Sequence, residues 1–415
     1  MPESSQFNHS LPCCINTKNI RLLDAGVRRH DGSVYFTTHD LRITSRGVRC
    51  TLFKPHDRFL MKSSAALLLA FLLFPVAALA VPPHAVIFMY HRFGDSRYPS
   101  TNIRMDQFKA QLDYLQEHDY KVWALDRIMN YLQLDEPLPD KVVAITVDDA
   151  YLSFYQNAFP LLKARDLPFT VFVSTDVVDQ GLPDFMTWDQ LREMKEAGAA
   201  FGNHSADHAH LVIRHKGETE AAWRERIRGD INKSKARLQK QLGADTNKKK
   251  LFAYPYGEYD DALTRLLDDM GYTAFGQQSG AVGQHTDRQR LPRYPMNEHY
   301  AVLDQFARKA ASLPLPVTAI SPREPVVQDN PPRLELTLAG GDYVVSQLAC
   351  YATGQGRIAT RVLQQQPLRL SAQAAQAFAS GRARYNCTAP TPDGKRWYWY
   401  SHPWLILPVG SETGE

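Results

Sequence analysis

Side chains that could hold a metal ion and activate water follow two apolar runs of the sequence. Asp148 and Asp149 come directly after the run at 141–147, and His204 and His208 follow a later run. Two adjacent carboxylates repel each other and are costly to desolvate unless they share a cation or a proton. Two histidines four residues apart on a helical turn can bind one ion. With Asp149 they form a set of two histidines and one carboxylate that leaves positions open for water or substrate.

A third turn, Tyr254-Pro255-Tyr256-Gly257, closes another apolar run. Pro and Gly at these positions favour a sharp turn that can direct a backbone N–H outward. Each pattern alone has an ordinary interpretation, because aspartates fit a polar turn and paired histidines fit a protein surface. Since the three patterns follow strand ends in order, we favour one shared site over three coincidences.

The runs that carry these side chains alternate with helical patterns. Apolar stretches of about four to eight residues fit buried strands, and apolar residues three or four apart fit helices. The alternation predicts an α/β fold with parallel strands, which gathers chemistry at the carboxyl ends of its strands. We expect strands at 84–91, 141–147, 167–174, 199–205, 251–257 and 272–276, and helices at 105–120, 187–198, 218–243 and 260–270.

These motifs resemble those of the NodB-type polysaccharide deacetylases, carbohydrate esterase family 4. The family's Thr-Phe-Asp-Asp-Gly stands here as residues 146–150, and its His-Ser/Thr-x-x-His as residues 204–208. Its Arg-x-Pro-Tyr-Gly stands as residues 253–257, with Ala253 in place of the arginine. The string MYHRFGDSRYPSTNI and the Trp-Asp-Gln-Leu at 188–191 are similar to the branch acting on poly-β-1,6-N-acetylglucosamine. The resemblance implies a distorted (β/α) barrel of the NodB type, for which we expect a domain at 81–313.

The resemblance also implies a role for each matching residue. Asp148 would be the catalytic base, Asp149, His204 and His208 would bind the metal, and the backbone N–H of Tyr256 would bind the oxyanion. The metal would be a divalent ion, with Zn²⁺ as first choice, although Fe, Co and Ni suit the same ligands. The implied reaction hydrolyses N-acetyl groups of an extracellular or cell-envelope polysaccharide similar to poly-N-acetylglucosamine and releases acetate.

Two functional residues of the family are missing from their usual positions. Arg293, in a later Leu-Pro-Arg segment, is our candidate for the arginine that braces the catalytic aspartate, with a surface arginine as the ordinary alternative. His91 ends the first strand and is our candidate general acid, with His299 in reserve. Ala150 replaces the motif's glycine, which is a mild departure, although alanine tolerates a positive φ less well than glycine.

Other functions stay open at this point. The scaffold also suits an O-acetyl esterase or a hydrolase of small cyclic amides, which product analysis would separate. A non-catalytic carbohydrate-binding matrix protein would need a degraded site, whereas both aspartates and both histidines are intact. We expect an acetylated polysaccharide as substrate, and the cell-envelope or biofilm export machinery is a further candidate partner.

The segment from Met61 to Ala80 has a basic start, an apolar stretch and a small-x-small ending, which together are typical of a secretory signal peptide. We therefore expect translation to start at Met61, residues 1–60 to be a mis-called upstream extension, and the protein to be periplasmic or secreted. A membrane anchor is the lesser alternative, since the stretch is short for a span of about 20 residues. An oxidising compartment then favours a disulfide between Cys350 and Cys387.

The C-terminal part differs in pattern. Six prolines between 314 and 332 predict a linker, followed by a β-rich accessory domain at 333–415 in which only 371–380 has a helical pattern. Its aromatic residues around 397–404 could stack on sugar rings, but alternate residues of a strand more simply face a core.

Composition excludes some classes of function. The formal net charge is +4, from 48 basic and 44 acidic residues, and residues 1–60 account for the whole surplus. The remaining chain is neutral, which argues against a nucleic-acid binder. With 44% apolar residues, the 415-residue chain is suited to two or three globular domains.

Overall fold

A computed structural model describes residues 83–407. The predicted signal segment at 61–80 and the predicted extension at 1–60 lie outside the described residues. Within 83–407, no helix combines the length and the apolar character that a membrane crossing requires. The described residues build two large sheets and a small two-stranded one, and all belong to a single compact unit.

The first large sheet has nine strands and carries the predicted site. Its hydrogen-bonded order is β10-β1-β5-β6-β7-β8-β9, while β11 pairs with β1 and β4 pairs with β5. Only the β1–β10 pairing is antiparallel among these. β1 and β5 are buried along their whole length, as expected for strands covered on both faces. The strands are β1 (His84–Tyr90), β4 (Lys121–Val122), β5 (Val142–Asp148), β6 (Thr170–Val173), β7 (Ala200–Asn203), β8 (Leu251–Ala253), β9 (Thr273–Phe275), β10 (Ala281–Gly283) and β11 (Tyr294–Pro295).

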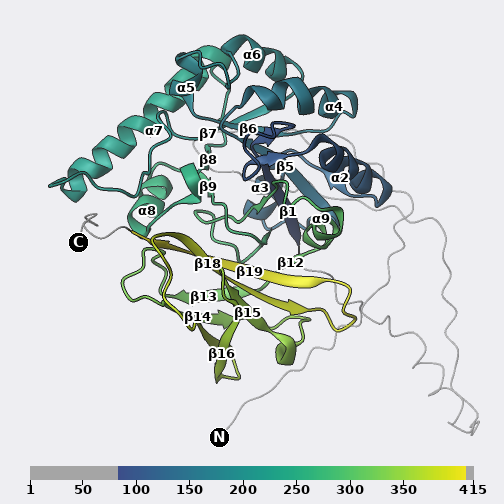
Figure 1. The fold of residues 1–415 in the computed structure, drawn as a ribbon, viewed down its shortest axis with the longest axis vertical. Coiled ribbons are helices and arrows are strands. Elements are labelled where there is room, and N and C mark those ends of the chain that lie inside the picture. The colour runs from purple at the N-terminus through teal and green to yellow at the C-terminus, as the bar shows by residue number, and fades with distance from the viewer. Residues whose placement is uncertain (1–82, 408–415) are drawn as a thin grey trace, which may run out of the picture. The chain divides into compact units, whose positions relative to one another are not determined.

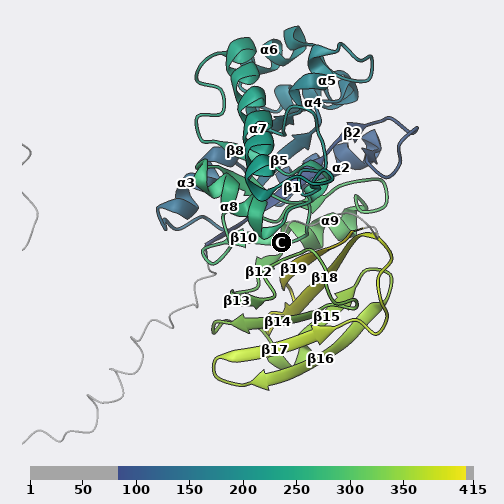
Figure 2. The same ribbon diagram turned by 90° about the vertical axis from the view of Figure 1, so that its left-hand side faces the viewer.

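Helices surround this curled sheet (Figures 1 and 2). Three begin at a side-chain cap, because Thr187, Thr219 and Asp260 each accept a hydrogen bond from the backbone N–H three residues later. The predicted α/β fold is confirmed, as a half-barrel of mostly parallel strands. The helices are α2 (Met105–Glu117), α3 (Leu125–Gln133), α4 (Phe159–Ala164), α5 (Thr175–Asp179), α6 (Trp188–Glu196), α7 (Glu220–Leu242), α8 (Asp261–Asp269) and α9 (Leu303–Ala310), with β2 (Arg92–Phe93), β3 (Asn102–Ile103) and the π-helical turn η2 (Phe154–Ala158) between them.

The strand expected at 251–257 is shorter than predicted. β8 ends at Ala253, and Pro255–Gly257 form the 3₁₀ turn η3. The cause is local, since Pro255 has no N–H to donate to a neighbouring strand and Tyr256 has a φ of 57°. The chain therefore turns sharply at the edge of the sheet where the site lies.

The second large sheet has eight strands in the order β12-β19-β18-β15-β16-β17-β14-β13. Alternate residues of β14 are buried, which fits a sheet with one face on a core. Its strands are β12 (Leu313–Pro314), β13 (Val317–Ser321), β14 (Arg333–Leu338), β15 (Ala349–Ala352), β16 (Gly356–Gln364), β17 (Leu368–Gln373), β18 (Gly381–Pro390) and β19 (Trp397–Ile406), and the short turn η4 (Val345–Gln347) precedes β15.

Two expectations for this part were wrong. The predicted linker at 314–332 contains β13, which pairs antiparallel with β14. The predicted helix at 371–380 begins inside β17. Leu368, Leu370 and Ala372 are buried at every second position opposite β14. That burial outweighs the helical propensity of the Ala- and Gln-rich segment, because strand formation depends strongly on packing.

The predicted disulfide between Cys350 and Cys387 is confirmed, and it joins directly paired residues of β15 and β18. The aromatic cluster divides between two environments. Tyr398 and Trp404 are 3% and 1% exposed in the core of the second sheet, whereas Trp399 packs against the core of the first. The interpretation of these rings as core residues is therefore correct for most of the cluster.

Candidate active site

The two aspartates diverge at the carboxyl end of β5. Asp148 is the last residue of the strand and is fully buried. Asp149 adopts a φ of 72°, so the chain leaves the strand abruptly and the two carboxylates meet different partners. Left-handed conformations of non-glycine residues are costly and gather at functional sites. Ala150 follows with a φ of 59°, the conformation for which the family motif has glycine.

The Asp149 carboxylate and two histidines form one compact cluster. Its Oδ1 lies 3.1 Å from Nε2 of His204 and 3.1 Å from Nε2 of His208. The ligand atoms of the three residues lie within 4.8 Å of one another. Burial opposes ionisation of Asp149, but the facing His204, His208 and His91 hold the pKa of its carboxyl well below the usual value. The cluster thus offers one anionic oxygen and two nitrogens to a cation.

The residues of this cluster fit a metal ion. His204 Nδ1 lies 2.7 Å from the carbonyl oxygen of Ala253, which fixes the proton on Nδ1 and leaves the Nε2 lone pair directed into the cluster. His204 Nε2 and Asp149 Oδ1 are both buried without a hydrogen-bond partner. Orphaned buried polar atoms are uncommon in folded proteins. A divalent cation bound by both atoms would satisfy them.

The loop that carries the histidines is held from α7. The Asp230 carboxylate accepts hydrogen bonds from the backbone N–H of Ala206, at 3.0 and 3.1 Å, and of Asp207, at 3.3 Å. Burial raises the pKa of Asp230 to about 6. Ser205 Oγ accepts from the N–H of His208 at 2.9 Å, which closes the turn between the two histidines.

Asp148 faces an arginine from the segment that directly precedes β11. Arg293 is fully buried and donates from Nη1 to Oδ1 of Asp148 at 2.7 Å and from Nη2 to Oδ2 at 2.8 Å. Arg293 is anchored in turn by the carbonyl oxygen of Gly276 and by Thr146 Oγ1. Burial alone would raise the pKa of Asp148, but Arg293 and His204 outweigh it and hold the pKa below its usual value. The structure therefore brings the candidate brace to the candidate base, and the surface alternative for Arg293 is wrong.

The two candidate general acids occupy different surroundings. His91 is half-buried, and its Nε2 lies 4.0 Å from Oδ2 of Asp149. Burial lowers the pKa of His91, although the Asp149 and Asp148 charges oppose this. His299 is exposed and packs against the ring of Tyr300. Of the two, the structure brings His91 to the cluster.

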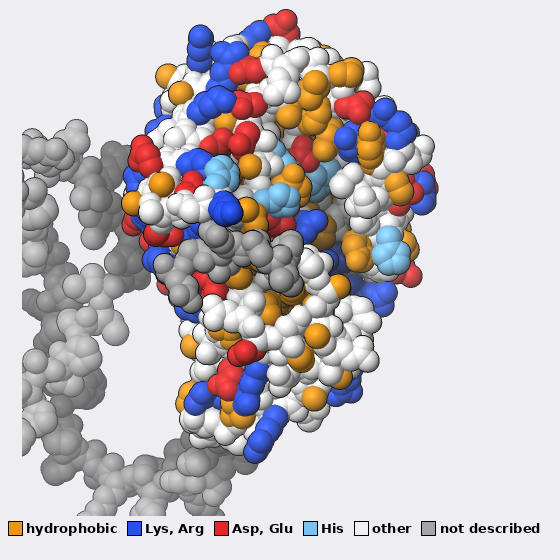
Figure 3. All heavy atoms as spheres, turned by 60° about the vertical axis from the view of Figure 1, so that its left-hand side comes forward, with side chains coloured by type: hydrophobic (Ala, Val, Ile, Leu, Met, Phe, Trp, Pro, Cys, Tyr) orange, Lys and Arg blue, Asp and Glu red, His pale blue; other side chains and the backbone are white. Residues whose placement is uncertain are grey.

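The Tyr256 turn borders the cluster on another side. Its ring lies 4.6 Å from the ring of His208 and stacks on His210 at 4.0 Å. His210 Nδ1 lies 2.6 Å from Oε2 of Glu258. Figure 3 shows histidine side chains gathered around a hollow on this face of the molecule.

Residues 135–275 match the polysaccharide deacetylase family. This chain carries a polysaccharide deacetylase domain. The poly-β-1,6-N-acetyl-D-glucosamine N-deacetylase of Staphylococcus aureus strain MRSA252 is 28% identical over 211 residues, which are 50% of this chain and 71% of that protein. The Escherichia coli K12 protein of the same name is 26% identical over 234 residues, or 48% of this chain and 34% of that protein. The structure of IcaB from Ammonifex degensii is 28% identical with a TM-score of 0.48, covering 55% of this chain and 98% of that one.

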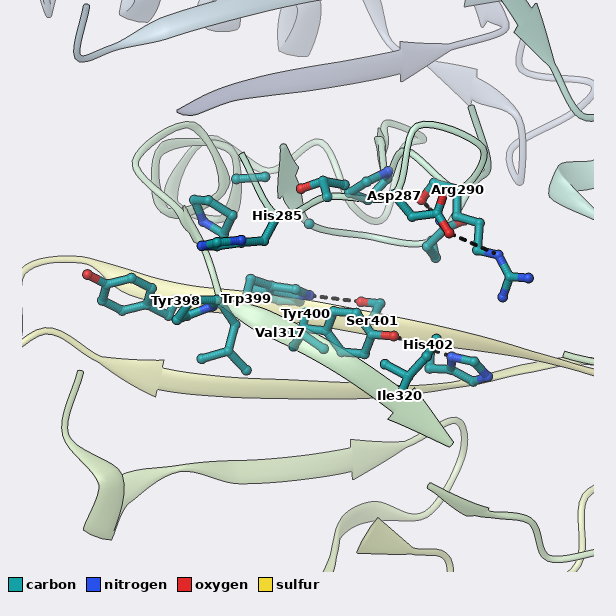
Figure 4. Close-up of a pocket in the computed structure, with 18 of the residues that line it drawn as sticks. His285, Asp287, Arg290, Val317, Ile320, Tyr398, Trp399, Tyr400, Ser401 and His402 are labelled. Carbon is teal, nitrogen blue, oxygen red and sulfur yellow. Dashed lines mark hydrogen bonds and ion pairs between the residues drawn. The ribbon is translucent and has the colours of Figure 1, made fainter. Parts of the chain in front are cut away.

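A separate cavity of about 300 Å³ lies between the deacetylase domain and β19 and β13 of the second sheet. Figure 4 shows Trp399 and Tyr400 on one side of it and His285 on the other. Pro83 lines the cavity, so it lies at the amino end of β1, opposite to His91. None of the candidate catalytic residues lines it, and we assign it no part in the chemistry of the deacetylase domain.

Sequence reasoning missed three residues around the deacetylase site. His210 and Glu258 support the Tyr256 turn, and His210 could have been noticed because it follows His208 by two residues. Arg382, on β18 of the second sheet, donates from Nη1 to the carbonyl oxygen of Tyr256. No sequence pattern indicates this contact, since it depends on how the two sheets pack.

Proposed function

We propose that this chain is a metal-dependent N-deacetylase of a polysaccharide similar to poly-N-acetylglucosamine and that it releases acetate. The observation that carries the proposal is the division of the two aspartates: Asp149 faces His204 and His208, while Asp148 faces Arg293. Such a site has a metal-binding half and a separate, ionised carboxylate to act as base. The names of the S. aureus and E. coli relatives support N-acetylglucosamine polymers as the substrate class.

A divalent cation held by Asp149, His204 and His208 would polarise the amide carbonyl of the substrate and make a bound water more acidic. Zn²⁺ suits this ligand set, and Fe, Co and Ni are alternatives with the same ligands. Metal content of the purified protein, compared with acetate release after chelation and re-addition of each ion, identifies the metal.

Asp148 is the proposed base that takes a proton from the attacking water. Arg293 keeps it ionised at neutral pH, and an ionised carboxylate retains lone pairs beyond the two that accept from Arg293. The backbone N–H of Tyr256 would donate to the developing oxyanion, a contribution that grows as negative charge appears there. Protonated His91 would deliver a proton to the leaving amine, so that acetate and a free amino sugar result.

Two matched substitutions test the division of roles. Asp148→Asn should keep the metal, because its three ligands remain, and should lose about 10²–10⁴-fold in acetate release. Asp149→Asn should lose metal affinity, and added metal should restore part of its turnover. The reverse result, with metal lost only from Asp148→Asn, would invert the assignment. If both variants kept their metal and full activity, Asp148 and Asp149 would be a polar turn without a catalytic role.

Competing reactions on the same scaffold are separated by substrate. A panel of N-acetylated and O-acetylated oligosaccharides, with and without a chelator, distinguishes an N-deacetylase from an O-acetyl esterase, and a cyclic amide belongs in the same panel. No acetate release from any of them would favour the binding-protein alternative.

The proposed place of action is the periplasm or the cell exterior, on the basis of the signal-like segment at 61–80. N-terminal sequencing of the protein from cells should find a start near Ala80, and residues 1–60 attached to the native protein would contradict this. Co-purification with components of the envelope or biofilm export machinery tests the proposed partnership.

A further inference from the structure

A cavity of about 290 Å³ adjoins the Tyr256 turn and is shared by the two sheets. On the deacetylase side, segments that follow β8, β9 and β11 line it, and on the other side β18 and β19 do. Its volume is near the lower end of the range typical of small-molecule sites, about 300–1,000 Å³. Its hydrogen-bonding and aromatic lining includes Tyr256, Gln277, Asn297, Tyr300, Arg382 and Arg384.

This cavity is the neighbour of the proposed catalytic site. The ring of Tyr256 lies 4.6 Å from the ring of His208, and the same residue lines the cavity. Arg382 donates to the Tyr256 carbonyl oxygen and its guanidinium lies 5.9 Å from the centre of the Tyr256 ring. A polymer with one sugar at the metal cluster would therefore extend its next unit across Tyr256 into the cavity.

The cavity carries an excess of positive charge. Arg382 and Arg384 line it, and Glu258 is the one carboxylate among the lining residues. Glu258 is already engaged, at 2.6 Å from His210 Nδ1 and 3.8 Å from Arg382 Nε. Arg384 is half-buried and no described carboxylate forms an ion pair with it.

A further cation lies directly behind the lining. Lys309 donates from Nζ to the carbonyl oxygen of Tyr300 at 2.8 Å. Burial lowers the pKa of Lys309 to about 8, with a smaller contribution from the Arg384 charge, so the amine is still largely protonated at pH 7. The positive field around the cavity is thus opposed by little local negative charge.

The charge of a sugar unit changes when it is deacetylated. An N-acetylated unit is neutral and offers a carbonyl oxygen to guanidinium donors, and its ring can stack on Tyr300, which is 37% exposed. A deacetylated unit carries an ammonium group that the arginines repel. We propose that this cavity holds the sugar next to the one under attack, and that it accepts an N-acetylated unit and disfavours a free amine.

This inference rests on the proposed function and predicts how the free amines are distributed along the product polymer. An enzyme with such a site slows beside a unit that it has already deacetylated, so the amines along the polymer are spaced apart. The β-rich domain thereby supplies the selectivity through Arg384, while the deacetylase domain supplies the chemistry.

The test uses the full chain and β-1,6-linked N-acetylglucosamine pentamers that carry one glucosamine at a defined position. Acetate release gives kcat/KM, and tandem mass spectrometry of the products gives the site of attack. With wild type, an amine next to the attacked unit should lower kcat/KM about five- to tenfold, the effect of one unfavourable charge pair that is largely exposed to water. High salt should weaken this preference, because exposed charges are screened.

Variants of Arg384 identify the source of the preference. Arg384→Gln should bring the ratio of kcat/KM between the fully acetylated pentamer and the pentamer with an amine next to the attacked unit towards one. Arg384→Lys should retain most of this ratio because the charge remains. Arg361→Gln, on the exposed face of β16 and outside the cavity lining, is the matched control and should behave as wild type.

Each outcome decides between the two proposals. Acetate release from both pentamers at equal kcat/KM would overturn the inference and leave the deacetylase function standing. An unchanged ratio in Arg384→Gln would also overturn it. No acetate release from the fully acetylated pentamer would overturn both proposals.

Discussion

Replacement of Arg293 by methionine is expected to disable the proposed base without removing the metal ligands. Arg293 and Asp148 are both fully buried and are joined by two hydrogen bonds of 2.7 and 2.8 Å. Breaking a buried ion pair by removal of one partner typically costs about 3–5 kcal/mol, because the other charge is left uncompensated in the interior. We expect Arg293→Met to lower the free energy of unfolding by about that amount.

The same substitution should abolish most of the activity. Without the guanidinium, burial of Asp148 favours its neutral form, so the carboxyl no longer accepts a proton from water. The loss of a positioned base predicts a decrease of about 10²–10⁴-fold in acetate release. Bound metal should be retained, because Asp149, His204 and His208 are untouched.

A double variant separates this explanation from general misfolding. Asp148→Asn with Arg293→Met removes both charges, so its loss of stability should be much smaller than the roughly 6–10 kcal/mol sum of two single losses. It should remain inactive. Arg214→Met is the matched control, because Arg214 is also buried and pairs with buried Asp260 at 2.8 Å.

Urea denaturation, acetate release and metal analysis measure these effects. Arg214→Met should lose stability yet keep far more of its activity per folded molecule than Arg293→Met. Additive losses in the double variant, or an Arg293→Met enzyme with near-normal activity, would refute the view that Arg293 acts through the charge of Asp148.

Three further outcomes are expected. Replacing both Cys350 and Cys387 with serine removes a disulfide that joins residues 37 positions apart. The free energy of unfolding should fall by about 3–4 kcal/mol relative to the oxidised wild type. An unchanged denaturation midpoint would contradict this. Burial lowers the pKa of His402 to about 3. The unfolded chain therefore binds more protons than the folded protein between pH 6.5 and 3. The folded protein is accordingly most stable above this pH range and loses stability as the pH falls through it. Between pH 7 and 4.5 the loss should be about 2–3 kcal/mol, and denaturation curves of His402→Gln should show a smaller pH dependence. Arg382→Met should lower kcat by about fivefold through a less firmly held Tyr256 turn, whereas a change in KM alone would limit this arginine to binding.

The parts of the site that lie in local motifs could be predicted, and those that depend on distant packing could not. Asp148, Asp149, His204 and His208 follow strand ends, and parallel strands bring their carboxyl ends to one edge of a sheet. Arg293 was only a candidate, because its pairing with Asp148 spans 145 residues and depends on how the chain after β9 crosses back over the sheet. Arg382 was unpredictable, since a single exposed arginine on a strand carries no signal of the domain that it contacts.

The same distinction explains the errors in the fold. A run of prolines is typical of linkers, yet β13 formed within it because β14 offered an open edge. The segment at 371–380 has helical composition but begins in β17, which pairs with β16 directly before it and with β14 from earlier in the chain. Sequence periodicity describes what a segment prefers in isolation, and a neighbouring strand can override that preference.

The bond between Asp148 and Arg293 also bears on how the enzyme comes into being. The two halves of the pair are separated by 145 residues, and strands β6 to β10 of the first sheet are encoded between them. A growing chain that has not yet delivered Arg293 contains the proposed metal ligands and the proposed base, but it lacks the charge that holds the pKa of Asp148 low. The proposed catalytic site is thus complete only once the segment around Arg293 has joined the sheet. The proposed activity would remain silent until Arg293 has reached Asp148.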